Sequence, residues 1–487
     1  MLKKNINLLS TFTFVALTAT TLQAASSDIK SAIKANGQMV YFEKQKEVDS
    51  FKELFSEGNF YGRLRNNNFY YWYDDSANNT HFVSAIGASA VYQSAKYNGF
   101  DFTVGMYGSR AFFNETSSNV NTIKPAKDFF SRYDYVNTGS KTLYTFAQAN
   151  IGYIISKTKL TLGRQLVETF YTKSNDTKMI PNSFDGAVLE SKDIKDSTIK
   201  FAYLAKQKLR DHKDSHSVLM YGDAASSSAT RPEWSQNDDS AMHKGLTYTA
   251  LAAAGKSTNA PLIVLDAQNN SVENLQLNFA SYIVPELLSE AMIEGNYKIN
   301  LDGFSLTPGI RYIEQFDNGA GDVGGASITK TGLSGYKDQN SLDARMIAAR
   351  VVAGFDDYKL NLGYTNILDK SDLVTPWRAF PTAGYTRSMG MYNWRANTKS
   401  YRVELTKGAN KTGIYKDGFI QTSILYIDGD KAKSENDRLY YYLGYIQNLA
   451  FAPQFQYRVR FGYNQYIKDS DTKTDYLDSR LEFNYTF

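Results

Sequence analysis

Hydrophobic and polar residues alternate along most of this 487-residue chain. In the final run, residues 480–487, leucine and aromatic side chains share one face, while charged, amide and hydroxyl side chains share the other. Similar runs centre on Gly62, Ile151, Tyr203, Ile310, Leu362, Val403, Leu443 and Val459. A side-chain period of two is typical of β-strands. The pattern therefore predicts an all-β protein with many strands.

Two all-β architectures could hold so many strands. The apolar face packs into a core in a soluble sandwich, whereas it faces lipid in an outer-membrane barrel. The alternation exceeds the roughly 250–300 residues at which one soluble core stops growing. Short turns such as 157–159 also alternate with long polar connections. We predict a transmembrane antiparallel β-barrel over residues 57–487 with about 18 strands. About 16 is the alternative, because weak segments between Leu246 and Tyr297 blur the count.

The residues before the barrel have a different pattern. Lys3 and Lys4 precede an apolar stretch, and Ala24 is a plausible cleavage point. These features predict a secretory signal peptide over residues 1–24, with an N-terminal core helix as the alternative. Residues 25–56 are polar, and we expect a partly helical periplasmic lead-in. Export together with a barrel predicts the outer membrane of a Gram-negative bacterium.

Composition and charge narrow the function. The chain has no cysteine, which excludes a disulfide framework and a thiol nucleophile. It also has no apolar run of about 20 residues, as a helical membrane protein would need. Without the signal peptide, 52 basic and 50 acidic residues remain. Charge therefore gives no indication of nucleic-acid binding, and any selectivity must come from where the charges lie.

The strand charges are expected to point into the barrel. A Lys or Arg facing lipid at mid-membrane costs about 2–4 kcal/mol. Strand residues that alternate with the lipid-facing apolar residues should therefore face the lumen. Among them the basic residues outnumber the acidic residues, which are Asp101, Glu290, Glu294, Glu404 and Glu482. The predicted lumen basic track consists of Arg63, Arg65, Arg311, Arg350, Arg402, Arg458, Arg460 and Arg480. A row of arginines along the pore would attract anions and still release them. Alternatively, the arginines pair with lumen acids and stiffen the wall.

Several short segments carry a resemblance to a known family. They are GRLR at 62–65, YYWY at 70–73, LGRQ at 162–165 and SNDTKMIPNSFDG at 174–186. They resemble OprD-type outer-membrane porins. The segments TPWR at 375–378, YTRSMG at 385–390 and NW at 393–394 are similar to a branch of that family found in campylobacter-like bacteria.

The resemblance implies a substrate-selective barrel with a basic ladder and a constriction loop folded into the lumen. The loop would span roughly Val167 to Phe184. Physically, a barrel this wide needs a constriction to select solutes. We expect Asp176, Lys178, Ser183 and Asp185 to face the arginine track across the pore. Alternatively, the loop lies outside the barrel and these residues are solvated.

Catalysis and metal binding find little support in the sequence. The four histidines are His81, His212, His216 and His243, and none lies at a convincing mid-strand position beside a nucleophile. His212 and His216 would suit a metal only on a helix, and a solvated loop is expected instead. We predict no enzyme and no cofactor. Calcium in the loops 317–322 and 428–430 is an alternative, although neither matches an EF-hand.

Together these features predict a passive porin that prefers anionic or carboxylate-bearing solutes, such as small organic anions or amino acids. Expected partners are outer-membrane lipids and lipopolysaccharide. The terminal strand ending in Phe487 also resembles the signature read by the barrel-assembly machinery. A monomer and a homotrimer both remain open. The alternative function is a surface adhesin or structural barrel with a plugged lumen, suggested by the long loops 209–244 and 367–399.

Overall fold

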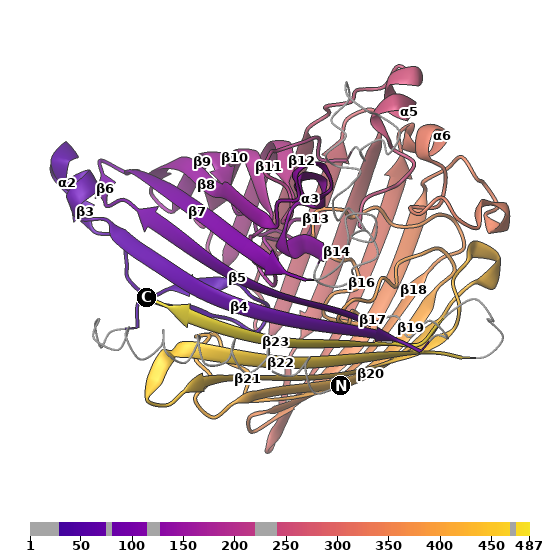
Figure 1. Cartoon of the computed structure of the whole chain (residues 1–487). Coiled ribbons are helices and arrows are strands. Elements are labelled where there is room, and N and C mark those ends of the chain that lie inside the picture. The colour runs from indigo at the N-terminus through magenta and orange to yellow at the C-terminus, as the bar shows by residue number, and fades with distance from the viewer. Residues whose placement is uncertain (1–28, 75–79, 114–126, 220–240, 468–473) are drawn as a thin grey trace.

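The protein is described here from a computed structural model covering residues 29–74, 80–113, 127–219, 241–467 and 474–487. The predicted signal peptide, 1–24, lies outside the described residues. In the described part, 18 long strands form a closed antiparallel barrel (Figure 1). The strands are β4 (Asn59–Tyr73), β5 (Thr80–Gln93), β7 (Phe100–Phe112), β8 (Thr142–Ile155), β9 (Thr158–Gln165), β10 (Ser183–Ser191), β11 (Ser197–Lys208), β12 (Leu262–Asn269), β13 (Leu275–Val284), β14 (Leu288–Tyr297), β16 (Phe304–Asp317), β17 (Ala344–Phe355), β18 (Tyr358–Ile367), β19 (Lys399–Lys407), β20 (Phe419–Asp428), β21 (Arg438–Leu449), β22 (Ala452–Tyr466) and β23 (Tyr476–Thr486). The predicted all-β barrel and its larger strand number are confirmed.

The structure also contains shorter strands and helices. The short strands are β1 (Ser31–Ile33), β2 (Met39–Tyr41), β3 (Glu47–Val48), β6 (Lys96–Tyr97) and β15 (Ile299–Leu301). The helices are α2 (Phe51–Ser56), α3 (Arg132–Thr138), α5 (Tyr248–Ala253) and α6 (Ala320–Gly324). No helix in these described ranges is long and apolar enough to cross a membrane.

Two ends of the barrel can be told apart by their connections. At the turn end, β8 and β9 are joined by residues 156–157, and β17 and β18 by residues 356–357. The C-terminus and α2 lie at this end, and α5 and α6 lie at the opposite, loop end (Figure 1). The long connections 209–261 and 368–398 belong to the loop end. Short turns on the periplasmic side and long outer loops are the usual arrangement in outer-membrane barrels.

The alternation of side chains follows the predicted orientation. On β4, Leu64 is 37% exposed, whereas Arg63 and Arg65 on the other face are 3% and 5% exposed. The exposed outer face is apolar on many strands, with Ile86, Phe201, Ile293, Ile310, Leu362, Val403, Leu443 and Phe461 among its residues. An apolar band of this kind contacts lipid. The charged strand residues are therefore left to face the lumen.

The weak alternation between Leu246 and Tyr297 has a physical reason. On β12, β13 and β14, inward residues such as Val264, Tyr282 and Met292 are apolar and fully or almost fully buried. They pack against loop residues inside the barrel, including Trp377. Because both faces of these strands are apolar here, the period of two is hidden in the sequence.

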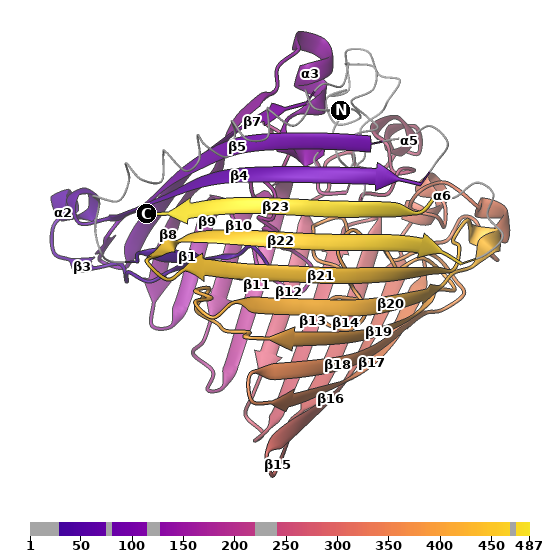
Figure 2. The same cartoon turned by 60° about the horizontal axis from the view of Figure 1, so that its bottom comes forward.

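The barrel closes where the last strand meets the first. β23 lies between β22 and β4 and pairs with both (Figure 2). The Phe487 backbone N–H donates to the Gly62 carbonyl at 3.0 Å, and the Gly62 N–H donates to the Phe487 carbonyl at 2.7 Å. A Cβ atom on Gly62 would lie 2.1 Å from the Phe487 ring. Glycine therefore leaves the space that the terminal aromatic ring occupies.

The N-terminal segment, expected to be a polar, partly helical periplasmic lead-in, contains a hairpin that no residue pattern indicated. The hairpin β1–β2 lies against the inner wall of the barrel. Ser31 and Ile33 are both 1% exposed, the Thr486 hydroxyl donates to the Ser31 carbonyl, and Arg458 donates to the Ile33 carbonyl. Backbone carbonyls, which leave no trace in a residue pattern, hold the hairpin. Much of residues 42–56 is exposed, including helix α2, which lies at the turn end (Figure 1).

Candidate functional site

The predicted arginine track lies inside the barrel. Six of its eight members are buried and two are partly buried, although all stand on strands whose alternate residues are exposed. Arg63 and Arg65 come from β4, Arg311 from β16, Arg350 from β17, Arg402 from β19, Arg458 and Arg460 from β22, and Arg480 from β23. The parity rule thus places each of these side chains on the lumen side.

The connection 166–182 between β9 and β10 crosses the lumen, and we call it the first infolded loop. Its Asp176 carboxylate accepts from Arg63 Nη1 at 2.9 Å and from Arg65 Nη1 at 2.5 Å. Asp176 is only 5% exposed. β4 is separated from β9 by β5, β7 and β8 in the wall. The two ion pairs therefore fix the loop across one side of the barrel.

Lys178, on the same loop, pairs with a carboxylate from another connection. Its Nζ lies 2.9 Å from Asp128 Oδ1 and 4.7 Å from the centre of the Phe69 ring. Arg210 also pairs with Asp128. Lys178 thus joins the first infolded loop to the connections before β8 and after β11, and its charge is shared with a carboxylate.

Two of the predicted loop residues belong to the wall. Ser183 and Asp185 lie on β10, and Asp185 accepts from Arg164 of β9 at 2.6 and 2.9 Å. Their assignment to the constriction loop was therefore wrong. A register shift between Asp185 and Gly186 breaks the alternation at the start of this strand. Such a bulge hides a strand from a period-two search.

Most arginines of the track have an acidic neighbour. Arg311 Nε donates to Glu294 at 2.6 Å, Arg402 Nη2 to Glu404 at 2.9 Å, and Arg460 pairs with Glu482. Arg480 donates to Asp478 at 2.6 and 2.8 Å. Asp478 lies on the same face of β23 as Arg480 but was not among the predicted inward acidic residues. These ion pairs stiffen the wall at the positions of the arginines.

Arg458 is held in another way. Its guanidinium donates to the carbonyls of Ile33, Lys34 and Ala35 in the N-terminal hairpin and to the Gln456 side chain. Among the described residues, no carboxylate lies within ion-pair distance of it. Neutral carbonyls orient this guanidinium, while Glu482, its cross-strand neighbour, forms its ion pair with Arg460.

The connection 368–398 between β18 and β19 also folds inward, and we call it the second infolded loop. The Trp377 indole N–H donates to the Val218 carbonyl at 2.7 Å, and its ring centre lies 4.7 Å from that of Tyr282. The Tyr282 hydroxyl donates to the Val374 carbonyl at 2.9 Å. These buried contacts attach the loop to β13 and to the connection after β11.

The second infolded loop brings Arg387 to the track. Its Cζ lies 4.4, 5.6 and 5.8 Å from the ring centres of Phe380, Tyr392 and Trp394, and Arg402 donates to its carbonyl oxygen. In the part of the chain described, its buried Nε and Nη1 have no hydrogen-bond partner. Arg387 was not among the predicted site residues and lies within the family-like segment 385–390. A basic residue in an aromatic-rich loop was the signal that could have found it.

The histidines and the carboxylate loops have structural roles. His212 and His216 are 2% and 1% exposed, so the expectation of a solvated loop was wrong. Burial lowers the pKa of His243 to about 4, and its neutral ring joins residues 243–245 to Gly325. Asp317 accepts three backbone N–H groups in the loop once considered for calcium. Within the described ranges, no group of three metal-type ligands occurs.

This architecture is that of a large outer-membrane β-barrel channel. A model of the OprD family of outer-membrane porins matches residues 136–254, a segment that includes the first infolded loop. None of the curated proteins matches the chain in sequence. The predicted resemblance to OprD-type porins is confirmed. The narrower resemblance to a campylobacter-like branch stays a prediction.

Solved structures share the fold over nearly the whole barrel. OccAB4 of Acinetobacter baumannii has a TM-score of 0.65 and 14% identity, with 88% of this chain and 98% of that chain covered. OccK9 (OpdG) of Pseudomonas aeruginosa has a TM-score of 0.67 and 14% identity, covering 89% and 99%. OpdK of Pseudomonas aeruginosa, in a structure with vanillate, has 0.63 and 12%, covering 89% and 99%. The protein is thus a channel for small solutes in the outer membrane of a Gram-negative bacterium.

Proposed function

We propose that this channel prefers small anions, above all carboxylate-bearing ones, and that the arginines inside the barrel cause the preference. The observation that carries the proposal is a local excess of positive charge. Near the seam, the guanidiniums of Arg63, Arg65, Arg458, Arg460 and Arg480 outnumber the carboxylates of Asp176, Asp478 and Glu482. Arg387 and Arg402, opposite Glu404, extend the excess along the wall.

The geometry supports passage as well as attraction. An arginine fork binds a carboxylate through two parallel hydrogen bonds and stays charged at any physiological pH. Each arginine here already shares its donors with a carboxylate, a carbonyl or an aromatic ring. A solute anion therefore meets several partial sites in succession, which favours entrance without trapping.

Arg387 is the cation best placed to act on a solute. The aromatic rings around it orient the guanidinium, and each cation–π contact contributes about 0.5–2 kcal/mol. Rings do not neutralise charge as a carboxylate does. The structure of OpdK with vanillate, itself a carboxylate, supports the same class of solute for this fold.

The adhesin alternative is weakened by the position of the second infolded loop. It rested on two long loops, and residues 368–398 lie inside the barrel, where Trp377 and Tyr385 are fully buried. Lipid on the outer face follows from the membrane location. Lipopolysaccharide contact, recognition of the Phe487 strand by the assembly machinery and a homotrimer stay predictions.

Solute uptake into proteoliposomes tests the proposal. Glutamate, glutamine and lysine have similar sizes and different charges, and we expect uptake in the order glutamate, glutamine, lysine. Arg387→Gln should slow glutamate and leave glutamine unchanged, because it removes one uncompensated charge from the path. Lys195→Gln, which removes an exposed charge in the turn 192–196, is the matched control. Lysine uptake equal to or faster than glutamate uptake would contradict the proposal.

A further inference from the structure

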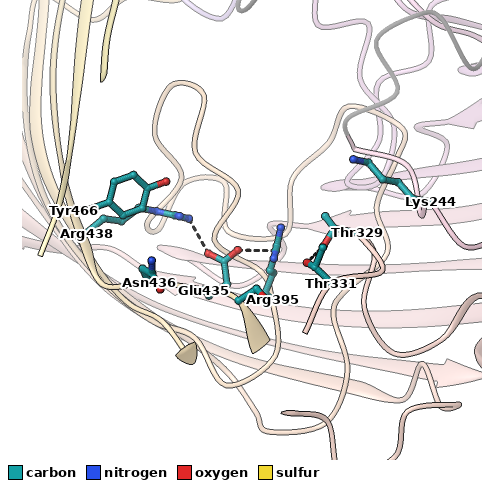
Figure 3. A pocket seen from close by; sticks show the side chains of 9 residues that line it. Lys244, Thr329, Thr331, Arg395, Glu435, Asn436, Arg438 and Tyr466 are labelled. Carbon is teal, nitrogen blue, oxygen red and sulfur yellow. Dashed lines mark hydrogen bonds and ion pairs between the residues drawn. The ribbon is translucent and has the colours of Figure 1, made fainter. Parts of the chain in front are cut away.

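The two ends of the barrel present different surfaces. At the loop end, charged side chains line a cavity of about 420 Å³, and Figure 3 shows Glu435 there between Arg395 and Arg438, at 2.7 and 3.1 Å. At the turn end, helix α2 instead presents two large phenyl rings, with Phe51 65% exposed and Phe55 51% exposed. Neighbouring exposed apolar side chains often mark a site of protein or membrane interaction. The surface of α2 therefore needs an explanation that the loop end does not.

Helix α2 has one apolar face and one polar face. The Glu53 backbone N–H donates to the Ser50 hydroxyl at 3.2 Å, which fixes the first turn of the helix. Phe51 and Phe55 are four residues apart, so they lie on the same face, and their ring centres are 5.2 Å apart. Lys52 and Glu53 are exposed on the remaining surface. The short helix thus separates aromatic from charged side chains.

The apolar face of α2 adjoins the outer wall of the barrel. The Phe55 ring centre lies 5.3 Å from that of Phe102, and the Tyr92 hydroxyl donates to the Phe55 carbonyl. Phe102 follows Asp101 on β7, and Tyr92 follows Val91 on β5. Asp101 and Val91 are inward residues, each 3% exposed. Because strand side chains alternate, Phe102 and Tyr92 belong to the lipid-facing side.

Backbone contacts hold α2 in this position. The Ala95 N–H donates to the Leu54 carbonyl at 3.1 Å, and the Lys96 N–H donates to the Lys46 carbonyl at 2.8 Å. Lys46 also pairs with Glu57 at 2.6 Å. These contacts join residues 46–57 to the connection between β5 and β7. The orientation of the two phenyl rings is thus set by the protein itself.

The rings of α2 continue an aromatic belt at the turn end. On the outer face there, the ring centres of Phe100 and Tyr153 are 4.4 Å apart, and those of Phe455 and Phe483 are 6.0 Å apart. The Phe51 ring centre lies 6.5 Å from that of Tyr97, three residues before Phe100. Aromatic residues form such girdles where an outer-membrane barrel crosses the boundary between lipid and water. The apolar face of α2 is therefore continuous with the lipid-facing band.

We propose that α2 is an interfacial anchor whose partner is the phospholipid of the periplasmic leaflet. Phe51 and Phe55 insert at the boundary between headgroups and acyl chains, while the charged face stays in water, as amphipathic helices do at membrane surfaces. Lys52, beside Phe51, extends toward the phosphate groups. The hairpin β1–β2 lies on the inner wall and α2 on the outer wall, so the anchor fastens the N-terminal segment across the rim. This contact with lipid is independent of the proposed solute preference.

Fluorescence of single labelled positions in proteoliposomes tests the anchor. The chain has no cysteine, so Phe51→Cys and Glu53→Cys each give one attachment point for the fluorophore NBD. Glu53 is the matched control, because it lies two residues away on the charged face. We expect the label at position 51 to emit at shorter wavelength and to be quenched by doxyl-labelled phospholipid. The label at position 53 should be quenched by aqueous iodide instead. Equal iodide quenching at the two positions would overturn the proposal.

Dilution separates lipid from a second copy of the chain as the occupant of this face. With lipid around the rings, the emission at position 51 should stay the same when the protein-to-lipid ratio is lowered. A shift to longer wavelength on dilution would show that another copy covers the rings, and would contradict the anchor. Phe55→Cys repeats the measurement at the neighbouring ring, and heat-modifiable electrophoretic migration shows that each variant barrel is folded. Because no solute is involved, a negative result here leaves the anion preference to its own uptake experiment.

Discussion

Replacing Asp176 with asparagine is expected to raise single-channel conductance and to shift selectivity further toward anions. Asp176 is the carboxylate that Arg63 and Arg65 share, and it holds the first infolded loop against β4. Breaking a buried ion pair from one side costs about 3–5 kcal/mol, and a wet lumen makes the lower figure the better guide. Asparagine keeps the shape of the side chain, so any change in conductance or selectivity results from the lost charge. Two unpaired guanidiniums then repel each other, and the loop moves away from the wall. Recordings in planar bilayers at low salt measure both the conductance and the selectivity.

Asp193→Asn provides the matched control for this experiment. Asp193 carries the same charge but lies in the turn 192–196, where it accepts from the hydroxyls of Ser156 and Thr158. Removing its charge should leave conductance and selectivity at their original values. If Asp176→Asn behaved like this control, the ion pairs would have no part in shaping the pore.

Trp377→Ala is expected to release the second infolded loop and give a larger, fluctuating conductance. Trp377 is fully buried among the loop, β13 and the connection after β11. Removing a buried tryptophan costs about 3–5 kcal/mol. The backbone pairing of the strands does not involve this ring, so the lost stability affects the docked loop and not the barrel. Trypsin should then cut at Arg378, Arg387 or Arg395 in the variant under conditions that leave the original protein intact.

Trp377→Phe separates packing from hydrogen bonding. Phenylalanine keeps an aromatic ring next to Tyr282 but cannot donate to the Val218 carbonyl, which costs about 1–3 kcal/mol. Its conductance and its resistance to trypsin should lie between those of the original protein and Trp377→Ala. A Trp377→Ala channel with unchanged conductance and an uncut loop would show that Trp377 does not hold the constriction.

The strands and the direction of their charges could be predicted because each strand residue has only two environments. Leu64 faces lipid, so Arg63 and Arg65 face the lumen, and the same rule places Arg480 and Arg460. The cost of a charge in lipid makes this choice nearly binary. Where both faces are apolar, as on β12, the rule gave a weak signal.

The interior of the barrel was harder to predict because its contacts join distant residues without any period. The Thr486 hydroxyl reaches the Ser31 carbonyl across a sequence separation of 455, so nothing local indicates that the N-terminal hairpin folds inward. Arg387 depends on aromatic residues of an irregular loop, and Asp185 on a bulge. Such positions are set by tertiary packing.

The reversal potential of the purified channel under a low-salt potassium chloride gradient tests the central claim most directly. The excess of guanidiniums over carboxylates in the lumen should make chloride more permeant than potassium, and replacing Arg387, Arg458 and Arg460 together with glutamine should reduce that ratio. A channel that passes potassium in preference to chloride would contradict the account.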